Sequence, residues 1–319
     1  MLKYIHRKIA LQWFILIGLT ALAIYNIIAK TQVSDQEGSA FLFHIFRNLF
    51  SQNQFIGKGI VIIILLAQII ILQLYYRKNE YSSKKSLLPA CFYLSIFLLT
   101  KSLIVISPFF FMLLFFLIII STNYTGNATT LKNNAFWVGM LIALATCFDV
   151  SSLILLVLAI ITLILNHFSI IKEICILMFG FLLVYFYFFS FHFFVNNHNE
   201  WLLTFQQIKI LEIYDKELLT RPPTLIALIT LSVLYLYFII RTKIINDSKI
   251  VIQRKRIITL NSRAILMIAC LFLSNSTYPN ALGYLFVHLS VYLAILSQEK
   301  SPLYFNEWVT VVTMVVLCL

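Results

Sequence analysis

The stretch FWVGMLIALATCFDVSSLILLVLAIITLIL, residues 136–165, consists of two apolar runs separated by the short segment FDVSS. Both runs are continuous rather than alternating, which favours helices over strands. A helix needs about 20 apolar residues to cross a hydrocarbon core of about 30 Å. The stretch therefore predicts two membrane helices, 134–148 and 152–168, joined by a turn at Asp149.

The whole chain has the composition of a membrane protein. Of its 319 residues, 61% are hydrophobic and only 11% are charged. Soluble domains carry about 25% charged residues, so that class is excluded. Only helices and closed barrels satisfy their backbone polar groups in lipid, and the runs are too continuous for barrel strands. We expect one integral membrane domain, 1–319, with an all-α fold.

Similar runs recur along the chain and predict a polytopic bundle of about 11 spans, with a range of 10 to 12. The third and fourth are either separate helices, with Pro108 opening the fourth, or one kinked pair. The expected spans are 9–29, 57–76, 86–101, 104–121, 134–148, 152–168, 173–194, 224–241, 258–275, 281–297 and 305–319.

Charge predicts the orientation. With a cytoplasmic N-terminus, most of the 24 lysines and arginines fall on the cytoplasmic side, chiefly in 77–85 and 241–256. The net charge of +12 then faces anionic lipid, and no motif for binding nucleic acid is present. We expect a multi-pass membrane protein with a cytoplasmic N-terminus and the lipid bilayer as its main partner.

Two predicted outer loops, 31–59 and 196–223, contain amphipathic segments. In FLFHIFRNLF (41–50), apolar side chains cover most of a helix surface and leave a narrow strip of His44, Arg47 and Asn48. The second segment repeats apolar residues at helical spacing from Trp201 to Tyr214. Both patterns predict helices that lie at the membrane surface.

Motifs of known chemistry are absent from the sequence. It has no phosphate-binding glycine loop, no GxSxG, no HExxH and no paired His/Cys cluster, and it has only eight glycines. We therefore predict no cofactor and no metal site.

The best catalytic candidates are Asp35 and Glu37, in SDQEG between the first span and the first surface segment. A carboxylate there either acts as general base towards an acceptor hydroxyl or belongs to a solvated loop. Cationic side chains on the outer face would bind a lipid phosphate. Arginine suits this role better than lysine, because its guanidinium can donate two parallel hydrogen bonds to a phosphate. The candidates for this role are Arg47, Lys58, Lys101 and Arg221.

Three other ionisable residues interrupt apolar sequence. Asp149 either caps the helix that DVSS opens or points into an outer cavity. His288 is interpreted as a packed, hydrogen-bonded core residue. Arg263 follows the basic RKRIITLNS, so we expect it to extend its side chain back to the inner interface.

Several stretches together resemble an uncharacterised family of multi-pass inner-membrane proteins from the Bacteroidota. They are LLPACFYLSIFLL (87–99), SPFFFMLLFFLIII (107–120), 133–165, KRIITLNSRAILMIACLF (255–272) and HLSVYLAIL (288–296). The resemblance implies an all-helical fold in a Gram-negative cytoplasmic membrane. It transfers no activity and no residue role.

The placement of Asp35 and Glu37 before a surface helix is similar to that in membrane glycosyltransferases that use polyprenyl-linked sugars. The first functional hypothesis is therefore envelope biogenesis, with a polyprenyl-linked glycan handled at the outer face. The second is a non-catalytic subunit or scaffold of an envelope complex, which binds a protein partner through 196–223 or 241–256. A transporter is a third alternative, for which the spans contain few polar residues at mid-depth.

Overall fold

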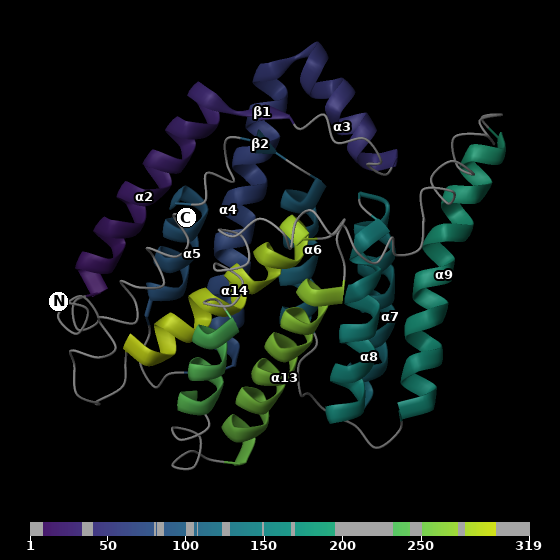
Figure 1. Cartoon of the computed structure of the whole chain (residues 1–319). Coiled ribbons are helices and arrows are strands. Elements are labelled where there is room, and N and C mark those ends of the chain that lie inside the picture. The colour runs from purple at the N-terminus through teal and green to yellow at the C-terminus, as the bar shows by residue number, and fades with distance from the viewer. Residues whose placement is uncertain are drawn as a thin grey trace.

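The computed structural model describes residues 9–33, 41–79, 81, 86–99, 105–106, 108–122, 128–148, 150–166, 170–194, 232–242, 251–273 and 278–297. This part of the chain is helical apart from short connections and one two-residue strand pair, so the all-α prediction is confirmed (Figure 1). Of the sequence-based predictions, the span 305–319 and the surface segment 196–223 lie outside the described residues.

Each predicted span that lies in the described residues corresponds to a helix. The helices are α2 (Ile9–Lys30), α3 (Phe41–Gln52), α4 (Gln54–Lys78), α5 (Leu88–Leu99), α6 (Pro108–Thr122), α7 (Ala128–Thr146), α8 (Ile154–Asn166), α9 (Ile170–Phe194), Ser232–Thr242, α13 (Val251–Leu273) and α14 (Tyr278–Ser297). A 3-10 turn, η1 (Val150–Leu153), precedes α8.

Among the described residues, three helices are long and apolar enough to cross a membrane: α2, α4 and the Ile171–Phe191 part of α9. Much of their surface is apolar and points away from the protein, for example Phe14 on α2, Ile63 on α4 and Phe186 on α9. Shorter apolar helical stretches of 10–17 residues lie within α5, α6, α7, α8, Ser232–Thr242 and α14. The fold is therefore that of a membrane protein with at least three candidate spanning helices.

A small parallel strand pair brings two connections together at one end of the bundle. β1 (Gln32–Val33) follows α2 and pairs with β2 (Val105–Ile106), which precedes α6. Helix α6 begins at Pro108. Proline is tolerated there because a backbone N–H in the first turn of a helix has no intrahelical partner. Because α5 ends at Leu99 and β2 precedes Pro108, the two predicted spans are separate helices and not one kinked pair. Figure 1 shows β1, β2 and α3 together at this end, which we call the α3 end.

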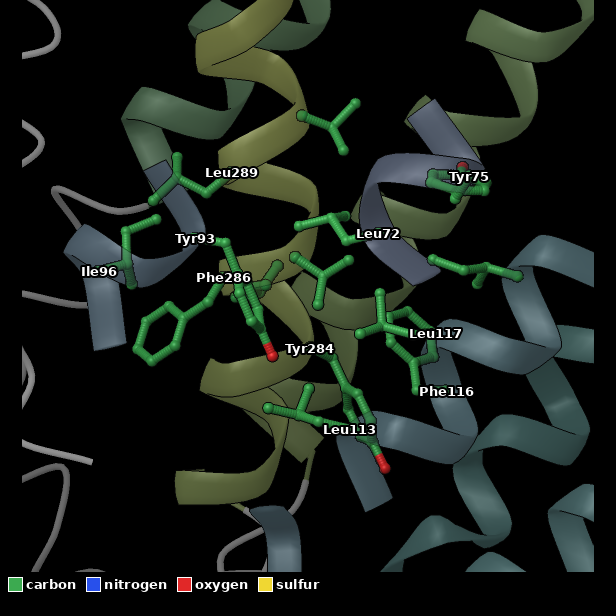
Figure 2. Packing of buried hydrophobic residues seen from close by; sticks show 14 of the residues in the cluster. Leu72, Tyr75, Tyr93, Ile96, Leu113, Phe116, Leu117, Tyr284, Phe286 and Leu289 are labelled. Carbon is green, nitrogen blue, oxygen red and sulfur yellow. The ribbon is translucent and has the colours of Figure 1, made fainter. Parts of the chain in front are cut away.

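Helix α5 forms the centre of the core. Its 12 residues span about 18 Å, which is too short to cross a bilayer alone. Because it is apolar on every side, it is buried on every side, against α2, α4 and α14. Figure 2 shows Tyr93 and Ile96 of α5 next to Phe286 and Leu289 of α14.

Helices α7 and α9 form the closest helix pair in the described residues. A Cβ added at Gly139 of α7 would overlap the carbonyl oxygen of Leu177, and one at Gly180 of α9 would overlap that of Phe136. The two backbones therefore touch directly, as at small-residue interfaces between membrane helices. The Thr146 hydroxyl of α7 lies 2.6 Å from the Tyr185 hydroxyl of α9, so a hydrogen bond joins the same two helices.

We expect Gly139→Ala and Gly180→Ala each to destabilise the protein by about 3 kcal/mol, because the backbones must separate to admit a methyl group. The measurement is thermal unfolding of the purified protein in detergent. The matched control is Gly18→Ala on α2, where an added Cβ meets nothing within 4 Å. Equal midpoints for all three variants would contradict the direct backbone contact.

Candidate functional site

The α3 end is built on an aromatic contact between α3 and α6. Phe43, Phe46 and Phe50 form the buried face of α3. The rings of Phe43 and Phe46 lie 6.1 Å and 4.5 Å from that of Phe111, edge to face. The backbone N–H of Leu42 also donates to the carbonyl of Cys147, at 3.0 Å. Helix α3 is thus held across the ends of α6 and α7.

The exposed face of α3 matches the predicted surface helix. Ile45 and Leu49 are 44% and 38% exposed, so apolar side chains face outward as well as inward. Arg47 is half-buried and Asn48 is exposed. A helix with apolar residues on both faces suits a position between the bundle and lipid.

The turn at Cys147 and Phe148 lies against α3 and α6. The ring of Phe148 stacks on that of Phe111 at 5.0 Å, with an interplanar angle of 7°. Asp149 itself lies outside the described residues, and η1 begins directly after it. The prediction that Asp149 caps this helix therefore stays a prediction.

The start of α4 is fixed by two side chains. The Asn53 side chain accepts from the backbone N–H groups of Phe55 and Ile56 and so caps α4. The Lys58 ammonium donates to the carbonyl of Ile28 at 2.7 Å, near the end of α2. Lys58 thus satisfies a carbonyl in the last turn of α2 and keeps further N–H donors.

Two of the six predicted site residues therefore lie at the α3 end. Arg47 is on α3 and Lys58 is on the first turns of α4. Asp35, Glu37, Lys101 and Arg221 lie outside the described residues. The segment with Asp35 and Glu37 connects β1 to α3, and both of these elements are at the α3 end. No group of three His, Cys, Asp or Glu that could hold a metal ion occurs in the described residues.

No protein-family model matches the chain, and neither a curated relative nor a solved structure is significantly similar to it. The argument for function therefore rests on the residues themselves.

The structure also contains a buried polar interior that the sequence analysis missed. Gln68 of α4 donates to the carbonyl of Phe110 at 2.7 Å and accepts from the Tyr93 hydroxyl at 3.0 Å. Gln12 of α2 accepts from the N–H of Leu87 at 2.7 Å. Both glutamines are fully buried. In the sequence, each of these glutamines is a single side-chain amide within an apolar run. A buried amide needs a hydrogen-bond partner, so this pattern could have indicated the polar interior.

The prediction for Arg263 was wrong, whereas that for His288 is confirmed. Helix α13 begins at Val251, so Arg263 lies more than three turns inside it and only 3% of the side chain is exposed. Its Nε donates to the Thr162 hydroxyl of α8 at 3.3 Å, so the side chain packs inside the bundle and does not extend away from it. His288 is buried, with Nδ1 3.0 Å from the Tyr284 carbonyl.

A tyrosine pair closes the opposite end of the core. The hydroxyls of Tyr75 and Tyr81 lie 2.9 Å apart. Burial raises the pKa of Tyr81 well above its usual value of 10.0, and Tyr75 raises it further, while the Arg263 charge opposes this shift. Tyr81 therefore stays a neutral phenol and can donate or accept a hydrogen bond.

We expect Phe111→Ala to destabilise the protein by about 4 kcal/mol, because it removes a buried ring that holds both α3 and the turn at Phe148. Thermal unfolding in detergent measures this effect. The control is Phe194→Ala, at a position 83% exposed near the end of α9, where the loss should be small. If the two variants unfolded at the same temperature, Phe111 would not anchor α3.

Proposed function

We propose that the protein is a multi-pass protein of the cell inner membrane, with about 11 spans and a cytoplasmic N-terminus, that handles a polyprenyl-linked glycan during envelope biogenesis. In this proposal the whole chain forms one integral membrane domain, and the α3 end faces the periplasm. The compartment is also the one implied by the resemblance to the Bacteroidota family.

The distribution of charge supports this orientation. Away from the α3 end, the described residues include Arg77 and Lys78 at the end of α4 and Lys172 at the start of α9. Arg254 and Arg256 follow in the first two turns of α13. Basic residues prefer the cytoplasmic side of a membrane, which leaves the α3 end outside.

One observation carries the functional part of the proposal. Helix α3 lies across the bundle end with Arg47 half-buried on it, directly after the segment that contains Asp35 and Glu37. A surface helix of this kind would bring a lipid-linked substrate to those carboxylates. Asp35 or Glu37 would act as the general base, and Arg47, Lys58, Lys101 and Arg221 would bind the lipid phosphate.

A second candidate function is a non-catalytic subunit or scaffold that binds a protein partner through 196–223 or 241–256. The start of α13 favours it, because the basic sequence Arg254–Arg256 lies on a helix with Arg254 exposed. A transporter is less well supported, since the buried Gln68 and Tyr93 bond to each other and not to an open path.

We expect the double variant Asp35→Asn/Glu37→Gln to lower the activity by about 100-fold or more, because a general base contributes about 100- to 10,000-fold. The measurement is transfer of a labelled sugar from a polyprenyl-linked donor in isolated membranes.

The matched control is Asp215→Asn/Glu217→Gln, which changes two acids of the same spacing in the other predicted outer segment. Both variants should accumulate in the membrane at the level of the natural protein. Full activity of the Asp35/Glu37 variant would exclude the catalytic proposal and leave the scaffold.

A further inference from the structure

Two hydrogen bonds fix the depth of α6 relative to α4. The Gln68 side chain donates to the carbonyl of Phe110 at 2.7 Å, and the Lys78 ammonium donates to the carbonyl of Ser121 at 3.3 Å. Between these bonds each helix advances by about 15 Å, so the two helices run side by side in the same direction. Both begin at the α3 end, and Phe110 lies level with Gln68.

The charged residues of α4 mark the edges of the hydrocarbon layer. Lys58 and Arg77 lie about 28 Å apart along the helix, and no charged residue lies between them. This length matches a hydrocarbon core of about 30 Å, so Lys58 lies at its edge on the side of the α3 end. Gln68 is about 15 Å deeper, and Pro108 is about 3 Å closer to the α3 end than Phe110. Helix α6 therefore begins about 12 Å below Lys58, inside the hydrocarbon layer.

Helix α7 ends at the depth where α6 begins, whereas α9 continues. The ring of Phe148, just after α7, stacks on that of Phe111 at 5.0 Å. The Thr146 hydroxyl lies 2.6 Å from that of Tyr185, and from this point α9 extends about 13 Å further to Phe194 (Figure 1). The helices pack in the order α4, α6, α7 and α9. At the α3 end, α4 and α9 therefore reach the edge of the hydrocarbon layer, whereas α6 and α7 stop about 12 Å short of it.

Helix α3 slopes down between these two levels. Its C-terminal end is high, because the ring of Phe50 packs directly against Gly57 at the start of α4. Its N-terminal half is low, because the ring of Phe46 lies 4.5 Å from that of Phe111 at the start of α6. Figure 1 shows this slope from the start of α4 to the end of α7. Asn48 lies midway between the two contacts, about 8 Å below the edge of the hydrocarbon layer.

The exposed face of α3 is that of a helix at the boundary between lipid head groups and acyl chains. It combines the apolar Ile45 and Leu49 with the amide of Asn48, and all three side chains are exposed. On α4, the exposed Ile63 lies equally deep, about 8 Å below Lys58, and faces hydrocarbon. An amide exposed to hydrocarbon at this depth lacks hydrogen-bond partners. The boundary must therefore lie deeper at α3 than at α4.

We propose that the phosphate-bearing head groups of membrane lipids descend at the α3 end, above α6 and α7, so that the leaflet is about 10 Å thinner between α4 and α9 than elsewhere. The half-buried Arg47 of α3 supplies a cation at this lowered surface. The proposal deepens the proposed function, because it brings a lipid phosphate to the end of the bundle that precedes and follows the segment with Asp35 and Glu37. It rests on the membrane assignment of α4 and not on catalysis by these acids.

The test is power saturation of spin labels on Asn48→Cys and, as the matched control, Ile63→Cys, in phosphatidylcholine liposomes. The five natural cysteines are replaced by alanine. The probes are oxygen, a water-soluble nickel chelate and a lipid that carries nickel on its head group. We expect both nickel probes to collide several-fold more often with the label at position 48 than with that at position 63. Should the cysteine-free protein fail to fold, a spin-labelled amino acid incorporated at the same positions of the natural chain gives the same comparison.

Three results would each overturn the proposal. Equal collision rates at positions 48 and 63 would mean that hydrocarbon covers α3, and a label at 48 that no probe reaches would mean that protein covers it. Collisions with the chelate but not with the nickel lipid would mean that water enters without head groups. The Asp35→Asn/Glu37→Gln variant should give the same collision rates as the natural acids, because the lowered surface follows from helix lengths. Loss of activity in that variant is thus a separate result.

Discussion

Large apolar side chains on the outside of α2, α4 and α9 set the main physical constraint on this protein. Phe14, Ile63 and Phe186 are 76%, 67% and 63% exposed, and each lies within a long apolar helix. Water cannot cover such a surface without a large free-energy cost, whereas hydrocarbon can. Helices satisfy their own backbone polar groups, so these three are stable in that surrounding.

Packing inside the bundle follows from the same constraint. Burying apolar surface against a neighbour gains little when lipid is the alternative, so shape and hydrogen bonds determine which helices associate. The direct contact at Gly139 and Gly180 joins α7 to α9 through shape. The bonds from Gln68 to Phe110 and from Tyr93 to Gln68 join α4, α5 and α6 through polar groups. The short α5 is enclosed by its neighbours α2, α4 and α14.

The sequence predicted the positions of the helices well, because long apolar runs and Pro108 are local signals. It did not predict how the helices face one another. The pattern of FLFHIFRNLF is apolar almost all round, so only the contact with Phe111 shows which face is buried. The error at Arg263 has a similar origin: the basic residues before it suggested a loop, but they lie inside α13. Of the candidate site, Arg47 and Lys58 lie in the described residues, and the role of Asp35 and Glu37 stays a prediction.

The central claim is that the outward faces of the long helices lie in hydrocarbon. Spin labels at Leu182 and Phe186 of α9, and at the exposed Lys78 that ends α4, test it in reconstituted liposomes. We expect frequent collisions with oxygen and rare collisions with a water-soluble nickel chelate at Leu182 and Phe186, and the reverse at Lys78. Nickel collisions at Leu182 and Phe186 as frequent as at Lys78 would contradict the membrane assignment.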